Sequence, residues 1–389
     1  MPVKIAYVTT GRSDYGPAAW LIKQLFSDVR FDVSLIVGGA HLAPDFGLTV
    51  QEIEEDGWSI AARVAFLQPE TGAVGFARGA AAALAEYAKV FERLRPDLVM
   101  LYGDRFELLP IATAAVLLGI PIAHLCGGDI TEGAVDDQIR HALTKLAHVH
   151  FPSSERSARR VLQMGEEPWR VHMVGDPALD NFVHGPRATD EEVRQAIGFA
   201  PDRSTLLVTF HPATLERERI PQQVEELMIA LKEHTGPIIM TAPAPDPGRD
   251  VIHAACLELA RENPRAVLVP SLGNRCYRSV LYSVGAMVGN SSSGLIEAPC
   301  VPLPVVNIGG RQRGRDRASN VIDVPAKRRS VRAGIARALS PEFRASLGGL
   351  RNPYGDGHAT ERILRVLGDL SGREQLLTKH FVGCEGMGA

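Results

Sequence analysis

The 389-residue chain lacks several features that would place it in a common functional class. It has no apolar run near the roughly 20 residues that a membrane-spanning helix needs, and no signal-peptide layout at its start. Its formal net charge is only −3, which argues against a general nucleic-acid binder. These absences predict a cytoplasmic protein that works with neither a membrane nor a nucleic acid.

Motifs for common cofactors and metals are also missing. There is no Gly-x-Gly-x-x-Gly turn after the first predicted strand, no Gly-x-x-x-x-Gly-Lys-Ser/Thr loop, and no tyrosine with a lysine four residues later. The five cysteines include no Cys-x-x-Cys pair, and the pairs His124/Cys126 and His148/His150 lack a third ligand at metal spacing. We therefore expect reduced thiols, no metal site and no cofactor.

The chain does contain a repeated alternation of apolar runs and helical patterns. Strands are predicted in the first half at 5–9, 33–37, 98–102 and 121–125, and in the second at 206–210, 238–241, 266–269, 286–288 and 305–307. Helices are predicted between them at 16–26, 77–94, 107–118, 222–233, 250–262 and 278–283. Continuous apolar strands, each followed by a helix, are typical of parallel sheets covered on both faces. The predicted fold class is α/β, with two Rossmann-like domains facing a central cleft.

The length exceeds what one compact core usually supports, so we expect separate domains. A Rossmann-like domain is predicted at 1–180 and a Rossmann-like nucleotide-binding domain at 203–357, joined by the charged, Pro- and Gly-containing stretch 181–202. The sequence leaves open whether the helix within 358–375 crosses back to the first domain. Residues 376–389 lack periodicity and are expected to form a loosely held tail.

The segment 289–297, Gly-Asn-Ser-Ser-Ser-Gly-Leu-Ile-Glu, predicts a phosphate site. A buried strand runs into a small-residue turn that opens a helix, where free N–H groups and the helix dipole favour an anion. Hydroxyl donors would come from Ser291, Ser292 and Ser293. Gly294 would let a ligand approach the backbone, and Glu297 can accept hydrogen bonds from a sugar diol. The structural alternative is a serine-rich helix cap with a surface glutamate.

Polar residues also gather where other predicted strands end. They are Gly11 to Gly16, Gly103-Asp104-Arg105, Gly127-Gly128-Asp129 and His211-Pro212, followed in one case by a helix carrying Asp136, Asp137, Arg140 and His141. Spacing of four residues allows the pairs Asp136–Arg140 and Asp137–His141. Each cluster alone has a structural interpretation, as a cap, a surface ion pair or a satisfied loop histidine. Together they suit removal of a proton beside a sugar's anomeric carbon while a diphosphate leaves.

Long, ordered motifs in this chain resemble the hydrolysing UDP-N-acetylglucosamine 2-epimerases. They lie at 103–107, 124–142, 210–215, 289–297, 306–315 and 352–358, and the likeness extends over roughly residues 3–370. The resemblance implies a two-domain fold like that of the GT-B glycosyltransferases. It implies a cofactor-free reaction that eliminates the nucleoside diphosphate to give a 2-acetamidoglucal and then adds water. It also implies a nucleotide-sugar or sugar-phosphate substrate and a homodimer or homotetramer.

Site residues follow from the same resemblance. Catalytic roles are expected for Asp104, Asp129, Asp137 and His211. The nucleotide is expected to contact Arg12, Ser13, Arg105, Ser292, Ser293, Glu297 and Arg311, with His41 and Arg140 near the sugar. We expect Asp104 or Asp137, ahead of the other two candidates, to remove the C2 proton.

Three departures from the family pattern leave the substrate open. Asp129 stands where the family often has the longer Glu, Gly310 where it often has Asp, and Ala244 within 243–248 where it has an Asn. The same loop gains two prolines, which stiffen it. An alternative therefore stays open: a transferase or synthase that joins or releases a nucleobase, phosphate or alcohol at an anomeric carbon, in a specialised nucleoside or glycoside pathway. A nucleotide-sugar sensor without catalysis is a third interpretation.

Overall fold

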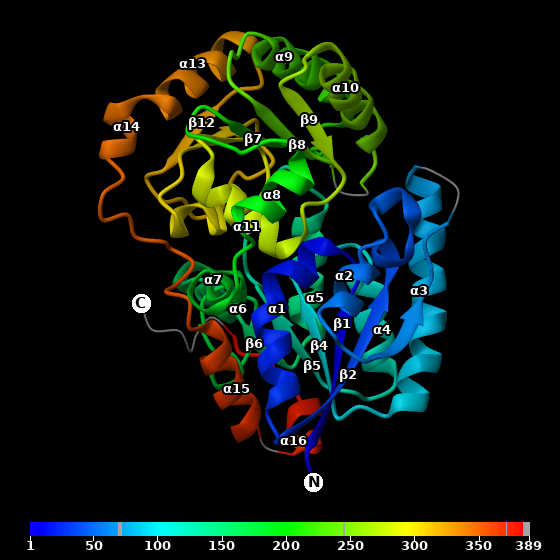
Figure 1. The fold of residues 1–389 in the computed structure, drawn as a ribbon. Helices are drawn as coiled ribbons and strands as arrows, with labels where there is room; N and C mark the ends of the chain where they lie inside the picture. Colours follow the sequence, from blue (N-terminus) through cyan, green and yellow to red (C-terminus); the bar gives the residue numbers. More distant parts are fainter. Residues whose placement is uncertain (69–71, 244–245, 371, 384–389) are drawn as a thin grey trace. The chain divides into compact units, whose positions relative to one another are not determined.

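The computed structural model describes residues 1–68, 72–243, 246–370 and 372–383, which group into two compact units (Figure 1). Unit 1 comprises Met1–Ile130, Asp136–His184 and the described part of Tyr354–Ala389. Unit 2 comprises Thr131–Val135 and Gly185–Pro353. The boundary after His184 falls inside the stretch that the sequence marks as a linker. The segment from Tyr354 onward belongs to unit 1, so the last long helix crosses back to it.

Unit 1 is built on a six-stranded parallel sheet of order β3-β2-β1-β4-β5-β6. Its strands are β1 (Val3–Thr9), β2 (Phe31–Gly38), β3 (Ile60–Val64), β4 (Leu98–Tyr102), β5 (Ile122–Leu125) and β6 (Val149–Phe151). Its helices are α1 (Arg12–Ser27), α2 (Val50–Glu55), α3 (Ala73–Leu94), α4 (Leu108–Leu117), α5 (Asp136–Leu146), α6 (Glu155–Gln163), α7 (Pro177–His184), α15 (Ala359–Asp369) and α16 (Arg373–Leu377).

Both faces of this sheet are buried, which explains the continuous apolar strands. Alternate residues of β1 enter different cores: Ile5 and Tyr7 pack with α1 and α15, whereas Ala6 and Val8 pack with α3 and α4. Burial on both sides selects an unbroken apolar run. The short strands β3 and β6 were not predicted, because neither forms such a run.

Unit 2 repeats the plan with a parallel sheet of order β12-β11-β10-β7-β8-β9. Its strands are β7 (Leu206–Thr209), β8 (Ile238–Thr241), β9 (Ala266–Val269), β10 (Ala286–Gly289), β11 (Val305–Ile308) and β12 (Val321–Val324). Its helices are α8 (Asp190–Ile197), α9 (Ile220–Lys232), α10 (Arg249–Glu262), α11 (Gly273–Ser283), α12 (Ser293–Ile296), α13 (Arg328–Leu339) and α14 (Pro341–Ala345).

The two sheets share one topology. In each, the first and fourth strands in chain order lie side by side at the centre, β1 beside β4 and β7 beside β10. The strand order reverses at this point, and ligands of such sheets bind beyond the carboxyl ends of the strands there. The prediction of an α/β fold with two Rossmann-like domains is confirmed.

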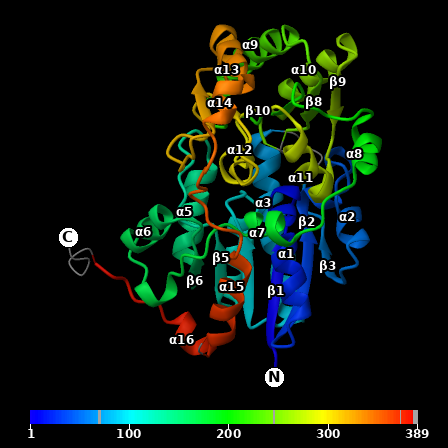
Figure 2. The ribbon, with the colours of Figure 1, turned by 60° about the vertical axis from the view of Figure 1, so that its left-hand side comes forward.

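The C-terminal segment is held firmly against unit 1. Helix α15 lies beside α1 and α7 (Figure 2), and the buried Asp180 carboxylate accepts hydrogen bonds from the first amides of α15, at Ala359 (2.9 Å) and Thr360 (2.5 Å). Buried Arg170 donates to the carbonyl oxygens of Leu376 (2.8 Å) and Thr378 (2.6 Å).

The expectation of a loose tail from residue 376 is therefore wrong for the residues described here, 376–383. Lys379 pairs with buried Glu166 at 2.7 Å, and the Val382 amide donates to the carbonyl of Gly165. These partners lie some 200 positions earlier in the chain, where local periodicity does not reveal them. Within the described ranges, no helix combines the length and apolar character needed to cross a bilayer.

Candidate active site

Arg140 is the centre of the polar cluster in unit 1. Its guanidinium is fully buried, forms an ion pair with Asp104 and lies 3.9 Å from Asp137. It also donates to the backbone carbonyl of Asp129 at 2.8 Å. One side chain of α5 thus contacts the three acids expected to be catalytic in this unit, Asp104 and Asp137 at their carboxylates and Asp129 at its backbone carbonyl. Asp137 in turn lies 3.6 Å from Nε2 of His141, the pair expected from their spacing.

The carboxylate of Asp129 is buried beneath the loop that follows β5. It accepts hydrogen bonds from Ser153 (3.2 Å) and Ser157 (2.5 Å), and only 4% of the residue is exposed. Gly128, with φ of +82°, runs so close to α6 that a Cβ there would lie 2.2 Å from the carbonyl oxygen of Ser157. The short aspartate therefore fits a site where the backbone itself passes close to its serine partners.

His124, within β5, bonds the loop after β4. Its Nε2 donates to the Gly103 carbonyl at 2.7 Å, next to Asp104. Burial lowers the pKa of this histidine to about 4, so the ring is neutral at pH 7. His124 is thus a structural bridge that holds the Asp104 loop. It and Cys126 contact different groups, since the Cys126 thiol faces Asp176 at 3.6 Å.

Three other predicted binding residues follow β1 and β2. Arg12 and Ser13 form the first turn of α1, where Arg12 is half-buried and Ser13 exposed. His41 is completely buried between Thr9 (2.9 Å) and Thr49 (2.7 Å) and lies 3.9 Å from Asp14. In this structure, the His41 ring supports the loop after β1 from below.

Asp14 lies in the cluster from Gly11 to Gly16 that the sequence marked, but it was given no role of its own, and it organises this loop. Its carboxylate accepts hydrogen bonds from Thr9, from the Thr10 amide and hydroxyl, and from the Gly11 amide. Burial alone would raise the pKa of Asp14, but the His41 contact and the hydrogen bonds from Thr9 and Thr10 outweigh it and lower the pKa. The spacing of Asp14 from Thr10 and Gly11, at a helix start, is the signal that would have found it.

Arg105, the remaining predicted nucleotide ligand in unit 1, follows Asp104. Its Nε lies 3.4 Å from buried Glu107, and its guanidinium lies over the ring of Phe106. The Arg105 side chain is therefore held close to its own loop.

In unit 2, Asn290 holds the loops after β7 and β10 together. Its side chain accepts from the His211 amide (2.7 Å) and donates to the His211 carbonyl (2.9 Å), as a neighbouring strand would. Its own carbonyl accepts from Arg311 (3.1 Å) and Gln312 (2.8 Å). The two predicted site residues His211 and Arg311 are thus fixed through one buried asparagine, which the sequence placed in the motif without assigning it a role.

The serine turn after β10 differs from the expected geometry. Helix α12 is only four residues long, so its dipole is short, and its first amides, at Ser293 and Gly294, already donate to Ser291. Ser291 and Ser292 are partly exposed, whereas Ser293 is buried and accepts from Tyr277 at 2.7 Å. A Cβ at Gly294 would lie 2.8 Å from Val305, so packing on β11 already requires glycine there. Glu297 is half-buried at the end of α12.

The five residues Thr131–Val135 belong to unit 2, although Asp129 and α5 on either side belong to unit 1. Their backbone is bound by two loops: the Val135 amide donates to the Thr214 hydroxyl (2.9 Å) and the Glu132 amide to the Arg313 carbonyl (3.3 Å). A Cβ at Gly133 would lie 2.7 Å from the Cα of Arg311. This close approach fixes the segment against the Arg311 loop.

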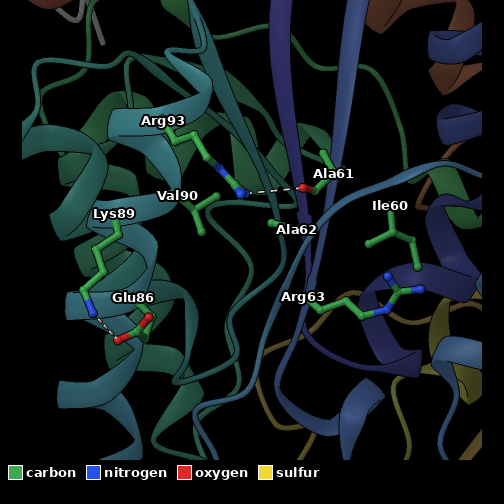
Figure 3. A pocket seen from close by; sticks show the side chains of 8 residues that line it. All are labelled: Ile60, Ala61, Ala62, Arg63, Glu86, Lys89, Val90 and Arg93. Carbon is green, nitrogen blue, oxygen red and sulfur yellow. Dashed lines mark hydrogen bonds and ion pairs between the residues drawn. The ribbon is translucent and has the colours of Figure 1, made fainter.

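A shallow pocket in unit 1 lies away from all these residues. It is lined by Ile60, Ala61, Ala62, Arg63, Glu86, Lys89, Val90 and Arg93, from edge strand β3 and helix α3 (Figure 3). Arg93 donates to the Ala61 carbonyl, and Lys89 pairs with Glu86. The predicted asparagine position, Ala244, lies outside the described residues. Across the described chain, no group of three or more His, Cys, Asp or Glu side chains is arranged to hold a metal ion.

Two Rossmann-like units, each with polar loops at its strand-order reversal, define a GT-B-like class of protein. A solved structure of the Methanocaldococcus jannaschii UDP-GlcNAc 2-epimerase, in complex with UDP-GlcNAc and UDP, shares this fold with a TM-score of 0.78. It is 19% identical, covering 94% of this chain and 99% of that one.

Sequence comparison identifies the family. Residues 23–368 match the family described as UDP-N-acetylglucosamine 2-epimerase, and the chain belongs to it. It is 36% identical to the UDP-N,N'-diacetylbacillosamine 2-epimerase (hydrolyzing) of Legionella pneumophila, over 97% of this chain and 98% of that protein. It is 34% identical to the GDP/UDP-N,N'-diacetylbacillosamine 2-epimerase (hydrolyzing) of Campylobacter jejuni, over 82% and 84%. The chain is thus an enzyme of a family that includes hydrolysing nucleotide-sugar 2-epimerases.

Proposed function

We propose that the protein converts a nucleoside-diphosphate 2-acetamido sugar into nucleoside diphosphate and the free 2-epimeric sugar. In the first step a base takes the proton from C2, the C–H electrons form a C1=C2 double bond, and the C1–O bond breaks toward the diphosphate. In the second step water adds its hydroxyl to C1, and a proton is delivered to the opposite face of C2. The observation that supports the proposal is the grouping of the Asp104 and Asp137 carboxylates and the Asp129 backbone carbonyl around buried Arg140.

Contacts within this cluster favour Asp137 as the group that moves the C2 proton. Asp104 is paired with a guanidinium, which cannot exchange a proton, whereas Asp137 contacts an imidazole, which can. Burial lowers the pKa of His141, against the opposing effect of Asp137, and Arg140 lowers it further. A neutral His141 can then accept the proton from Asp137 and pass it on. Asp104 is the second candidate. Asp129 ranks last, because its carboxylate is buried and already accepts hydrogen bonds from Ser153 and Ser157.

We assign the nucleotide to the loops of unit 2. The hydroxyl groups of the partly exposed Ser291 and Ser292 and the Arg311 guanidinium supply donors for a diphosphate. Half-buried Glu297 supplies an acceptor for the ribose hydroxyls, and His211 stands on the adjacent loop, tied to the serine turn through Asn290. Arg12, Ser13 and Arg105 are proposed as further ligands. His41 acts through the loop that it supports.

The two relatives above suggest the sugar. Both are named for N,N'-diacetylbacillosamine, a 2,4-diacetamido sugar, and both exceed 30% identity. We therefore propose that the preferred substrate carries a second acetamido group at C4. We also propose that the protein is cytoplasmic and forms a homodimer or homotetramer. Light scattering on the purified protein would establish the number of subunits.

The decisive experiment is incubation in deuterated water with UDP-GlcNAc and with the UDP- and GDP-linked 2,4-diacetamido sugars. We expect release of nucleoside diphosphate and a free 2-epimer with one deuterium at C2, fastest for a diacetamido substrate. Release without deuterium would indicate simple transfer at the anomeric carbon. No release from any substrate would overturn the proposal. Replacing Asp137 with Asn should abolish deuterium incorporation, whereas Glu132→Gln, a control on an exposed side chain, should not.

A further inference from the structure

A buried carboxyl group outside the proposed catalytic set lies behind the loops that carry Asp104 and Asp129. Asp176 precedes α7 and is 1% exposed. One of its oxygens accepts from the Tyr102 hydroxyl (2.8 Å) and the Ala178 amide (2.9 Å), and the other faces the Cys126 thiol at 3.6 Å. No role was assigned to this residue from the sequence.

The positions of its two side-chain partners are informative. Tyr102 is the last residue of β4, two positions before Asp104. Cys126 directly follows β5, three positions before Asp129, and has an unusual positive φ of 61°. Glycines separate both partners from the acids: Gly103 has φ of +86° and Gly128 has φ of +82°. Because glycine leaves a backbone permissive, these loops need a fixed point at their base.

Asp176 is itself held by the returning C-terminal segment. Its amide donates to the carbonyl of Tyr354 at 2.8 Å. At Gly175, which has φ of +93°, a Cβ would lie 3.1 Å from the same carbonyl oxygen. The returning segment therefore fixes the backbone of Asp176, whose carboxyl group accepts from Tyr102 at the end of β4 and faces Cys126 after β5.

We propose that Asp176 is a positioning residue of this enzyme, which braces the ends of β4 and β5 and thereby holds in place the Asp104 carboxylate and the Asp129 carbonyl, both of which contact Arg140. The inference rests on the proposed function, because it concerns the acids that act on the sugar. Misplacing catalytic groups by about an ångström can cost roughly a hundredfold in rate. Loss of the brace should therefore lower kcat, whereas KM should change little if nucleotide contacts in unit 2 dominate binding.

Hydrogen bonding, rather than charge, is the expected basis of the brace. Burial raises the pKa of the Asp176 carboxyl; the Ala178 amide and Tyr102 oppose this effect, and nearby Asp129 adds to it. An asparagine would keep the oxygen that accepts from both Tyr102 and Ala178. Asp176→Asn is thus a conservative rescue, and Asp176→Ala removes every bond of the brace.

The test compares Asp176→Ala, Asp176→Asn and Tyr102→Phe with the wild type in kcat, KM, melting temperature and release of the unsaturated C1=C2 sugar. We expect kcat to fall about tenfold or more in Asp176→Ala, with KM within about twofold and more unsaturated sugar released, because the groups around Arg140 are no longer held in place. The kcat of Asp176→Asn should stay within about fivefold of the wild type. The kcat of Tyr102→Phe should lie between those of Asp176→Ala and Asp176→Asn.

Asp180→Asn is the matched control. Asp180 is an equally buried carboxylate on α7, but it bonds only the start of α15 among the contacts described above. It should lower the melting temperature and leave kcat unchanged. The inference is overturned if Tyr102→Phe keeps the wild-type kcat, or if Asp176→Asn is as impaired as Asp176→Ala. A wild type that releases no nucleoside diphosphate would instead defeat the proposed function.

Discussion

The two units have the same topology but build their functional loops from different materials. In unit 1, contacts between charged side chains dominate: buried Arg140 pairs with Asp104 and lies 3.9 Å from Asp137, and it also donates to the backbone carbonyl of Asp129. In unit 2, contacts with the backbone dominate. The Asn290 side chain bonds both the amide and the carbonyl of His211, and a Cβ at Gly289 would lie only 1.9 Å from the Thr209 carbonyl oxygen. The charged side chains of unit 1 suit proton transfer, and the rigid, hydroxyl-bearing loops of unit 2 suit a diphosphate. The difference also implies that the units respond differently to mutation and to pH.

The strongest way to break the comparison is Arg140→Met. This change leaves Asp104 without its buried partner, so we expect kcat/KM to fall roughly a thousandfold and the free energy of unfolding to fall by about 3 kcal/mol. Initial rates and urea unfolding measure both. UDP binding, followed by calorimetry, should be unchanged, and Arg140→Lys should recover part of the activity. Activity within tenfold of the wild type would contradict the central role of Arg140.

Acid should distinguish the units next. The pKa of His124 is lowered from 6.5 to about 4 by burial, so the folded state binds this proton less readily than the unfolded chain. The stabilisation from His124 is complete above pH 6.5 and is lost as pH falls toward 4, a loss of about 3 kcal/mol.

Hydrogen exchange at pH 7.5, 5.5 and 4.5 should therefore show β4 and β5 opening before the strands of unit 2. His124→Gln keeps a donor for Gly103 without a titrating ring, and its unfolding free energy should depend less steeply on pH. Equal slopes for the variant and the wild type would exclude His124 as the cause.

Asn290→Ala tests the backbone-built half. It removes two hydrogen bonds to His211, which we expect to cost about 2 kcal/mol of stability and to weaken UDP binding about tenfold. Calorimetry measures the binding. Asn290→Asp keeps the acceptor for the His211 amide but loses the donor, so its effect should be intermediate. UDP affinity equal to that of the wild type would show that UDP binding does not depend on the support that the Asn290 side chain gives to His211.

Lys379→Met should have the smallest effect. The Lys379 ammonium contacts Glu166 and the carbonyl oxygens of Lys145 and Ala147 at the end of α5, which also carries Asp137 and Arg140. We expect a loss of about 1 kcal/mol in unfolding free energy with little change in kcat. Lys327→Met, which breaks an exposed pair with Glu226, is the control and should cost less. A loss of unfolding free energy no greater than that of the control would mean that the contacts of Lys379 do not stabilise the protein.

The sequence predicted most of the framework because its strands are buried on both faces. It also placed the acids and the serine turn at strand ends, where topology brings them to one edge of each sheet. It missed β6, since His148 and His150 interrupt its apolar pattern; the structure satisfies His150 through Glu166 at 3.0 Å. Local patterns carry no information about such distant partners.

The supporting residues were harder to predict for the same reason. Asp176 and Arg170 look like ordinary surface residues in the sequence, but the end of the chain covers both. Gly294 was interpreted as room for a ligand, whereas the neighbouring strand already requires it. The individual roles of the site residues remain predictions.

The return of the chain from Tyr354 to unit 1 has a consequence for biosynthesis. Residues 1–184 are synthesised before α15 and before the residues whose carbonyl groups Arg170 bonds, so unit 1 can complete its packing only after those residues have been made. Residues 185–353 of unit 2 leave the ribosome before unit 1 has all its residues. We therefore expect unit 2 to finish folding before unit 1, although most of it is synthesised after residues 1–184. A chain that ends before residue 354 should therefore contain all of unit 2 but only part of unit 1.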